Sequence, residues 1–195
     1  MLTATYSLVT LSIEQKNAHC GLSKLEKSIK NSVSDHAHPD PAMLASAVSR
    51  LSRFDEYCHG RRVEVYVIPA IRKATREADS LLDELESLAT QAHGLLRKVR
   101  EGLRMAFEQG MARVNDLCRS MELFCVTLFK RLSKDEELVR VAQRVISIDE
   151  WFVMAADFLH HDAEQRLRRR YGDGGGRRPR AHAPRTAEAA DFLLA

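Results

Sequence analysis

The chain has 195 residues, 45% of them hydrophobic, and its 30 basic and 27 acidic side chains leave a formal net charge of +3. This apolar content is enough for a sizeable core, which excludes a chain that is disordered throughout. A net charge this small does not require a nucleic acid as partner, and we expect none. Only 5 prolines and 9 glycines occur, and the stretches between them are rich in helix-forming residues. We therefore predict an all-α fold.

The first residues, MLTATYSLVTLSIEQ, have no basic region and are interrupted by hydroxyl side chains, so they do not resemble a signal peptide. No stretch approaches the roughly 20 apolar residues that a membrane span requires. We expect a cytoplasmic protein with no membrane span. The cysteines show no Cys-x-x-Cys spacing, and we interpret them as reduced, buried packing residues. They are Cys20, Cys58, Cys118 and Cys125.

Apolar residues recur at three- and four-residue steps in four long segments, which predicts four amphipathic helices. Their expected ranges are about residues 3–30, 41–75, 78–109 and 111–145. Asp40 and Pro41 suit the cap and first turn of the second helix. Pro69 has no N–H to donate and predicts a kink within that helix. Long helices with short connections indicate an antiparallel up-down-up-down four-helix bundle.

A shorter fifth helix is predicted after the bundle. Ser147 and Glu150 have the spacing of a capping box, which would open a helix that continues to about residue 170. From Gly172 onward the sequence GDGGGRRPRAHAP has no apolar periodicity, so we expect a disordered basic tail. The predicted organisation is a bundle over residues 1–146, an additional C-terminal helix over 147–171 and a flexible tail over 172–195.

Candidate metal ligands occur once on each expected bundle helix. His19, His59 and His93 lie on the first, second and third helices, and Asp135 lies on the fourth. Bundles often hold metal ions between facing helices through such side chains, so we predict that these four groups converge in the interior. His19 and His59 are 40 residues apart, and His93 and Arg131 are 38 apart. These similar offsets indicate two copies of one helical hairpin.

Three motifs are shared with a known family. They are HGRRVEVYVIPAI from His59, QAHGLL around His93 and LFKRLSKDEE around Arg131. In order and spacing they resemble the hemerythrin-like (HHE) cation-binding domains, over about residues 5–146. In that family the first and third helices each carry a histidine, and the second and fourth carry a histidine followed by a carboxylate. The resemblance implies a mononuclear or dinuclear non-haem iron, or another divalent cation, and a role in oxygen, redox or iron sensing.

Around His59 the sequence departs from the family pattern. The carboxylate expected one turn later is replaced by Val63, and Glu64 lies about 140° around the helix, so we expect it to point elsewhere. Glu56 and Asp55, three and four residues before His59, share its face and would substitute for the missing carboxylate.

The fourth-helix histidine of the family aligns with Arg131, whose guanidinium cannot ligate a metal. We expect Arg131 to pair with Asp135, four residues later, which would replace a metal's charge by a buried salt bridge. The metal site is then partly lost. Its predicted ligands are His19, His59, His93, Asp135 and Glu56.

A metal-free protein is the alternative. It would be a helical-bundle interaction module that binds a protein partner or forms a homo-oligomer. We interpret His36 and His38, His160 and His161, and the arginines between residues 166 and 180 as solvated surface. No Gly-rich phosphate loop or nucleophile elbow is visible, so the sequence implies no catalytic activity.

Overall fold

The structure, a computed structural model, describes residues 2–34, 40–109 and 111–171, with side chains described over slightly narrower ranges. The described residues contain no strand, and the all-α prediction is confirmed. In chain order the segments are α1 (Leu2–Ser34), α2 (Pro41–His59), the π-helix η1 (Val63–Val67), α3 (Ile68–Ala74), α4 (Asp79–Gln109), α5 (Met111–Ser133), α6 (Asp135–Val145) and α7 (Ile148–Tyr171).

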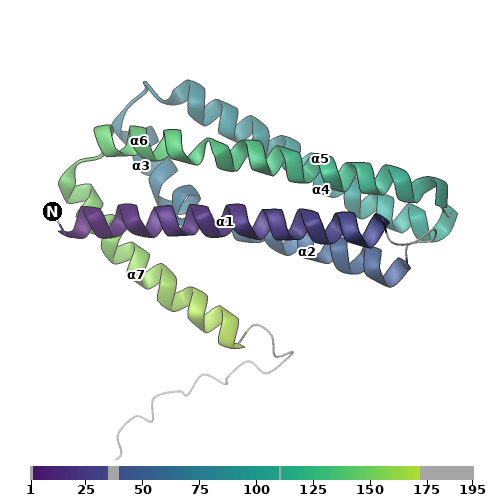
Figure 1. The fold of residues 1–195 in the computed structure, drawn as a ribbon. Coiled ribbons are helices and arrows are strands. Elements are labelled where there is room, and N and C mark those ends of the chain that lie inside the picture. The colour runs from purple at the N-terminus through teal and green to yellow at the C-terminus, as the bar shows by residue number, and fades with distance from the viewer. Residues whose placement is uncertain (1, 35–39, 110, 172–195) are drawn as a thin grey trace, which may run out of the picture.

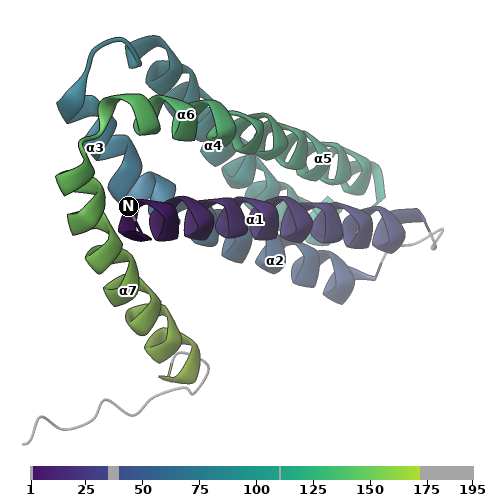
Figure 2. The same ribbon diagram turned by 60° about the vertical axis from the view of Figure 1, so that its left-hand side comes forward.

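The helices form an antiparallel bundle, as the sequence predicted (Figure 1). The long helix α1 packs against α2 and α5, and α4 packs along α5 and against α2. At the end of the bundle that holds the N-terminus, α3, η1 and α6 take the place of α2 and α5 (Figures 1 and 2).

The second predicted helix is interrupted earlier than Pro69. α2 ends at His59, and the N–H of Gly60 bonds to the carbonyl of Glu56 at 3.1 Å. The chain then makes one π-helical turn, in which the N–H of Ile68 bonds to the carbonyl of Val63, five residues earlier. Pro69 falls in the first turn of α3, where a missing N–H costs little. The interruption therefore lies at residues 60–62 and not at the proline.

The fourth predicted helix is also two helices. Lys134 separates α5 from α6, and its N–H bonds to the carbonyl of Arg131 at 3.1 Å, a tighter step than the α-helical one. The first turn of α6 carries three carboxylates, which a helix N-terminus favours.

The predicted capping box opens α7. The N–H of Glu150 donates to Oγ of Ser147 at 3.2 Å, and the N–H of Ser147 donates to the Glu150 carboxylate at 3.2 Å. α7 starts beside α1 and its last turns project from the side of the bundle (Figure 2). The predicted tail over residues 172–195 lies outside the described residues.

The buried apolar side chains form two separate cores. The first core joins α1, α2, α4 and α5 and includes Leu22, Leu51, Val99 and Phe124. The second core joins the N-terminal half of α1 to η1, α3, α4, α6 and α7, and includes Leu11, Val67, Leu138 and Phe158. Of the helices that pass from one core to the other, α1 carries the buried Glu14 at the level between them, between Leu11 of one core and Ala18 of the other.

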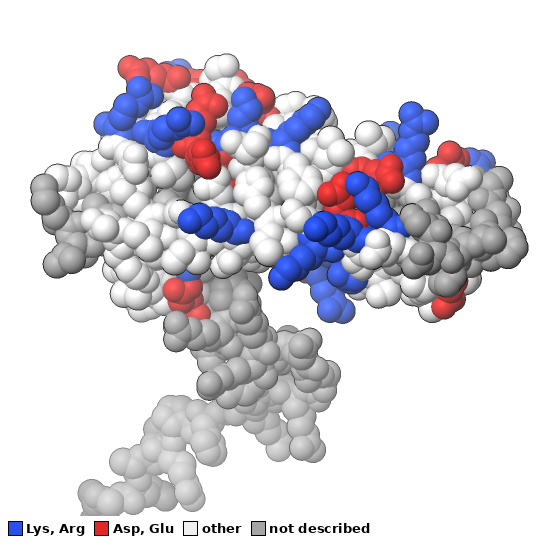
Figure 3. Space-filling view, in the orientation of Figure 1, with Lys and Arg blue, Asp and Glu red and all other residues white. Residues whose placement is uncertain are grey.

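On the face shown in Figure 3, basic and acidic side chains lie next to one another in mixed groups, and uncharged surface separates these groups. No helix in the described part of the chain has the length and apolar content that crossing a membrane requires.

Three of the four cysteines are buried, and Cys20 is exposed, which corrects the expectation for that residue. All four are free thiols. Burial raises the pKa of Cys58 and of Cys125 to about 12. It also raises the pKa of Cys118 above its ordinary value.

We therefore predict that one thiol of the native protein reacts rapidly with Ellman's reagent at pH 8, because Cys20 is exposed and the other three cysteines are buried. The other three should react only after unfolding in guanidinium. Cys20→Ser should abolish the rapid phase, and two or more rapidly reacting thiols would contradict the packing described above.

Candidate functional site: a buried ionic layer and a histidine-carboxylate group

A layer of charged side chains separates the two apolar cores. We call this set the ionic layer. Its members are Glu14 of α1, Arg61, Arg62 and Glu64 around the π-helix, Arg131 of α5 and Asp135 of α6. Every member except Glu64 is buried, and Glu64 is half-buried.

The centre of the layer is an ion pair between Arg61 and Asp135. Nη2 of Arg61 donates to Oδ2 of Asp135 at 2.5 Å, and both side chains are almost fully buried. Beside it, Nη2 of Arg131 lies 2.6 Å from the carboxylate of Glu64. Each pair joins the segment after α2 to the α5–α6 region.

A third interaction joins α1 and α7 to the same segment. Both carboxylate oxygens of Glu14 accept from the backbone N–H of Arg62, at 3.2 and 3.0 Å, and one also accepts from its Nη1 at 2.9 Å. The other terminal nitrogen of Arg62 donates to Asp162 of α7. A pocket of about 370 Å³ borders these groups, so the layer reaches solvent at this edge.

Burial controls the protonation of the layer. It raises the pKa of Asp135, an effect that the positive charges of Arg61 and Arg131 partly offset. It also raises the pKa of Glu64, again offset by Arg131 and Arg61. Burial acts to lower the pKa of Arg61, but the charge of Asp135 raises it above its ordinary value. The guanidinium of Arg61 therefore remains protonated.

These pairs differ from the one that the sequence predicted. Arg131 pairs with Glu64, and among the described residues no ion pair joins Arg131 to Asp135. The helix boundary at Lys134 lies between Arg131 and Asp135, so the two side chains do not have the i, i+4 geometry of one continuous helix. Glu64 was expected to point elsewhere, but the interruption at residues 60–62 and the π-helical turn change its direction.

The buried ion pair between Arg61 and Asp135 leads to a prediction about stability. Asp135→Asn leaves the guanidinium of Arg61 buried without its counter-charge, and should lower the free energy of unfolding by about 3–5 kcal/mol in urea titrations. Replacing both partners, Arg61→Met with Asp135→Leu, should cost less than Asp135→Asn, because neither charge is then buried.

The neighbouring exposed carboxylate provides the control: Glu136→Gln should change stability by no more than about 0.5 kcal/mol. A loss below about 1 kcal/mol for Asp135→Asn would show that Arg61 does not depend on this partner.

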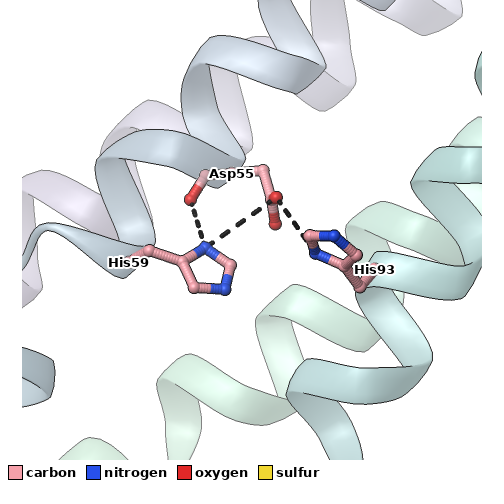
Figure 4. Close-up of side chains that lie close together, drawn as sticks. All are labelled: Asp55, His59 and His93. Atoms are coloured by element: carbon pink, nitrogen blue, oxygen red, sulfur yellow. Dashed lines mark hydrogen bonds and ion pairs between the residues drawn. The ribbon is translucent and has the colours of Figure 1, made fainter.

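A different group lies at the edge of the layer, between α2 and α4. Asp55 and His59 lie one turn apart on α2, and His93 faces them from α4 (Figure 4). Oδ2 of Asp55 is 3.8 Å from Nδ1 of His59 and 3.9 Å from Nδ1 of His93. The side chain of Asp55 is only 7% exposed, whereas those of His59 and His93 are 48% and 73% exposed.

The carboxylate of Asp55 is not satisfied by the protein. Its Oδ1 is buried and has no hydrogen-bond partner among the residues that the structure describes. A buried carboxylate oxygen without a partner is costly, and a bound cation or water is the usual explanation. Two imidazoles and one carboxylate are also a common ligand set for divalent transition metals. The residues present therefore fit a metal ion.

The distances also fit. One ligand atom from each of Asp55, His59 and His93 can be chosen so that all lie within 4.8 Å of one another. Around a tetrahedral ion at about 2.1 Å, ligand atoms are roughly 3.4 Å apart, so a closure of up to about 1.4 Å is sufficient. Nδ1 of His59 also lies 2.8 Å from the backbone carbonyl of Asp55. A proton on Nδ1 would donate to that carbonyl and leave Nε2 free to ligate.

The structure distributes the predicted ligands differently from the sequence expectation. It brings His59 and His93 together, but at the surface. Asp135 is bonded to Arg61 in the ionic layer. His19 is half-buried with its ring 6.3 Å from that of Phe129.

The carboxylate beside His59 is also not the one predicted. Glu56 is exposed and lies outside the group, where Asp55 takes its place. Asp55 and Glu56 both share a helix face with His59. Only Asp55 also lies on the side of α2 that faces α4 and His93.

Sequence reasoning also missed the members Glu14, Arg61 and Arg62. A signal was present for Glu14, which falls in the apolar repeat between Leu11 and Ala18. A charged residue in such a repeat indicates a buried ion pair. Nothing in the local pattern of Arg61 and Arg62 distinguishes them from surface arginines.

Comparisons with known proteins add no family. No family model, curated protein or solved structure matches the chain. The hemerythrin-like resemblance therefore rests on the motifs alone.

Proposed function

We propose that this protein is a cation-binding helical-bundle protein that holds one divalent transition-metal ion between α2 and α4. Its ligands would be Asp55, His59 and His93. The observation that supports this most directly is the buried carboxylate of Asp55, with one oxygen unpartnered and the other beside two imidazoles. Iron, zinc and manganese suit this ligand set, and three protein ligands leave positions open for water or a small molecule.

The proposal places the ion outside the bundle interior. The hemerythrin-like resemblance assigns an interior position to ligands of the second and fourth helices, but Arg61 and Arg131 occupy that region. Two unit charges 4 Å apart interact by about 4 kcal/mol at an effective dielectric near 20, so a divalent ion beside a guanidinium is strongly disfavoured. We therefore propose a mononuclear site, with oxygen, redox or iron sensing as the role that the resemblance implies.

Metal titration of protein purified without a histidine tag tests the proposal. One equivalent of Zn²⁺, or of Fe²⁺ under anaerobic conditions, should bind in competition with a chromophoric chelator. Asp55→Asn, His59→Ala and His93→Ala should each weaken binding by at least about 100-fold, since even partners of ligands contribute roughly 10- to 100-fold. At a metal concentration 100 times the dissociation constant, stability should rise by about 2.7 kcal/mol.

Two exposed residues provide matched controls. Glu56→Gln removes the neighbouring carboxylate of α2, and His160→Ala removes an exposed histidine of α7. Both should bind metal as the parent does. Less than about a tenth of an equivalent after reconstitution, or equal binding by His93→Ala, would refute the site.

The metal-free interaction module is the second candidate function. The observation that favours it is the outer surface of α7, where four large apolar side chains are 59–73% exposed. Normal partner binding by a protein that holds no metal would select this candidate over the first.

A further inference from the structure

The helix α7 has two apolar faces, of which the bundle covers only one. The covered face packs into the second core and carries Trp151, Met154, Ala155 and Phe158. The other face is exposed, with Ile148 at 73%, Phe152 at 61% and Leu159 at 59% of their full accessible surface. At roughly 100° per residue the two faces are centred about 100° apart, so one neighbour cannot cover both.

The exposed face is a continuous stripe, which we call the outer stripe. It consists of the exposed residues Ile148, Phe152, Ala156, Leu159 and Ala163. Their steps of three and four residues keep them on one side of the helix, and the two alanines allow a second helix to approach closely. The sequence continues the spacing at Leu167. The spacings between successive stripe residues from 148 to 167 are then the same in both directions along the helix. An antiparallel helix of the same sequence would therefore present its stripe residues at matching heights.

Charge along α7 favours the same arrangement. Asp149 and Glu150 lie in the first turn, and the sequence near the helix end is basic, with arginines at 166, 168, 169 and 170. An antiparallel pair of α7 helices would place each acidic start beside the basic end of the other, whereas a parallel pair would place like charges together.

We infer that the outer stripe binds the outer stripe of a second copy of this chain, forming an antiparallel two-fold dimer through α7. The inference is independent of metal binding. With the two-fold axis between residues 157 and 158, Phe152 packs on Ala163 of the other copy, and Ala156 on its Leu159. This is a self-complementary interface that closes without leaving a further stripe exposed.

The mass in solution tests the inference. The full chain of 22.1 kDa should sediment with twice that mass at micromolar concentration. Phe152→Glu should weaken self-association by at least about tenfold, because it places a charge in the desolvated stripe, against Ala163 of the other copy. Val126→Glu changes an exposed apolar residue on α5 and should leave the dimer intact. Circular dichroism should show that both variants are folded.

Disulfide cross-linking tests the direction of the pairing. In a Cys20→Ser background, Phe152→Cys combined with Ala163→Cys should cross-link two chains under mild oxidation. Phe152→Cys alone should not, because its two copies would lie about 16 Å apart along an antiparallel pair.

Four results would overturn the inference. The first is a monomer at all concentrations up to 100 µM, and the second is a dimer that Phe152→Glu does not weaken. The third is efficient cross-linking by Phe152→Cys alone, which would indicate a parallel pair. The fourth is loss of the dimer on changing Phe192 and Leu193 to serine, which would assign the stripe to the end of the chain itself.

Discussion

The ion pair between Arg61 and Asp135 is the interaction on which the rest of the structure depends. Arg61 follows the end of α2, and Asp135 is the first residue of α6, so both helix interruptions occur at one level of the bundle. The apolar cores lie on either side of this level. Moving either interruption by one residue would rotate a charged side chain into an apolar core, where burying it without a partner is costly.

A buried ion pair seldom adds net stability over well-packed apolar residues, because both charges lose their hydration. Its effect here is on register. Arg61, Arg131 and Arg62 bond to carboxylates on four different segments, so each of α1, η1, α6 and α7 has one preferred height relative to the others. The tether from Arg62 to Asp162 also holds α7 against the bundle, which leaves its outer stripe facing solvent.

The contrast between Asp55 and the other carboxylates of this region explains why it is the candidate ligand. Glu14, Glu64 and Asp135 each bond to an arginine, but among the described residues Asp55 has only His59 and His93 beside it. Imidazoles can be neutral and can share a metal ion with the carboxylate, whereas a guanidinium excludes one. The arginines that fill the interior are therefore consistent with our proposal of a cation site at the edge between α2 and α4.

The sequence by itself determined the helical class, the limits of α1 and α4 to within a few residues, the capping box of α7 and the proximity of His59 to a carboxylate one turn earlier. These features follow from local periodicity and spacing. Only the tertiary structure decided which of Asp55 and Glu56 faces His93, which acid each arginine bonds, and where the second and fourth helices are interrupted. These outcomes depend on charges distant in the chain, since Arg61 and Asp135 are 74 residues apart, and no local pattern specifies such a pairing.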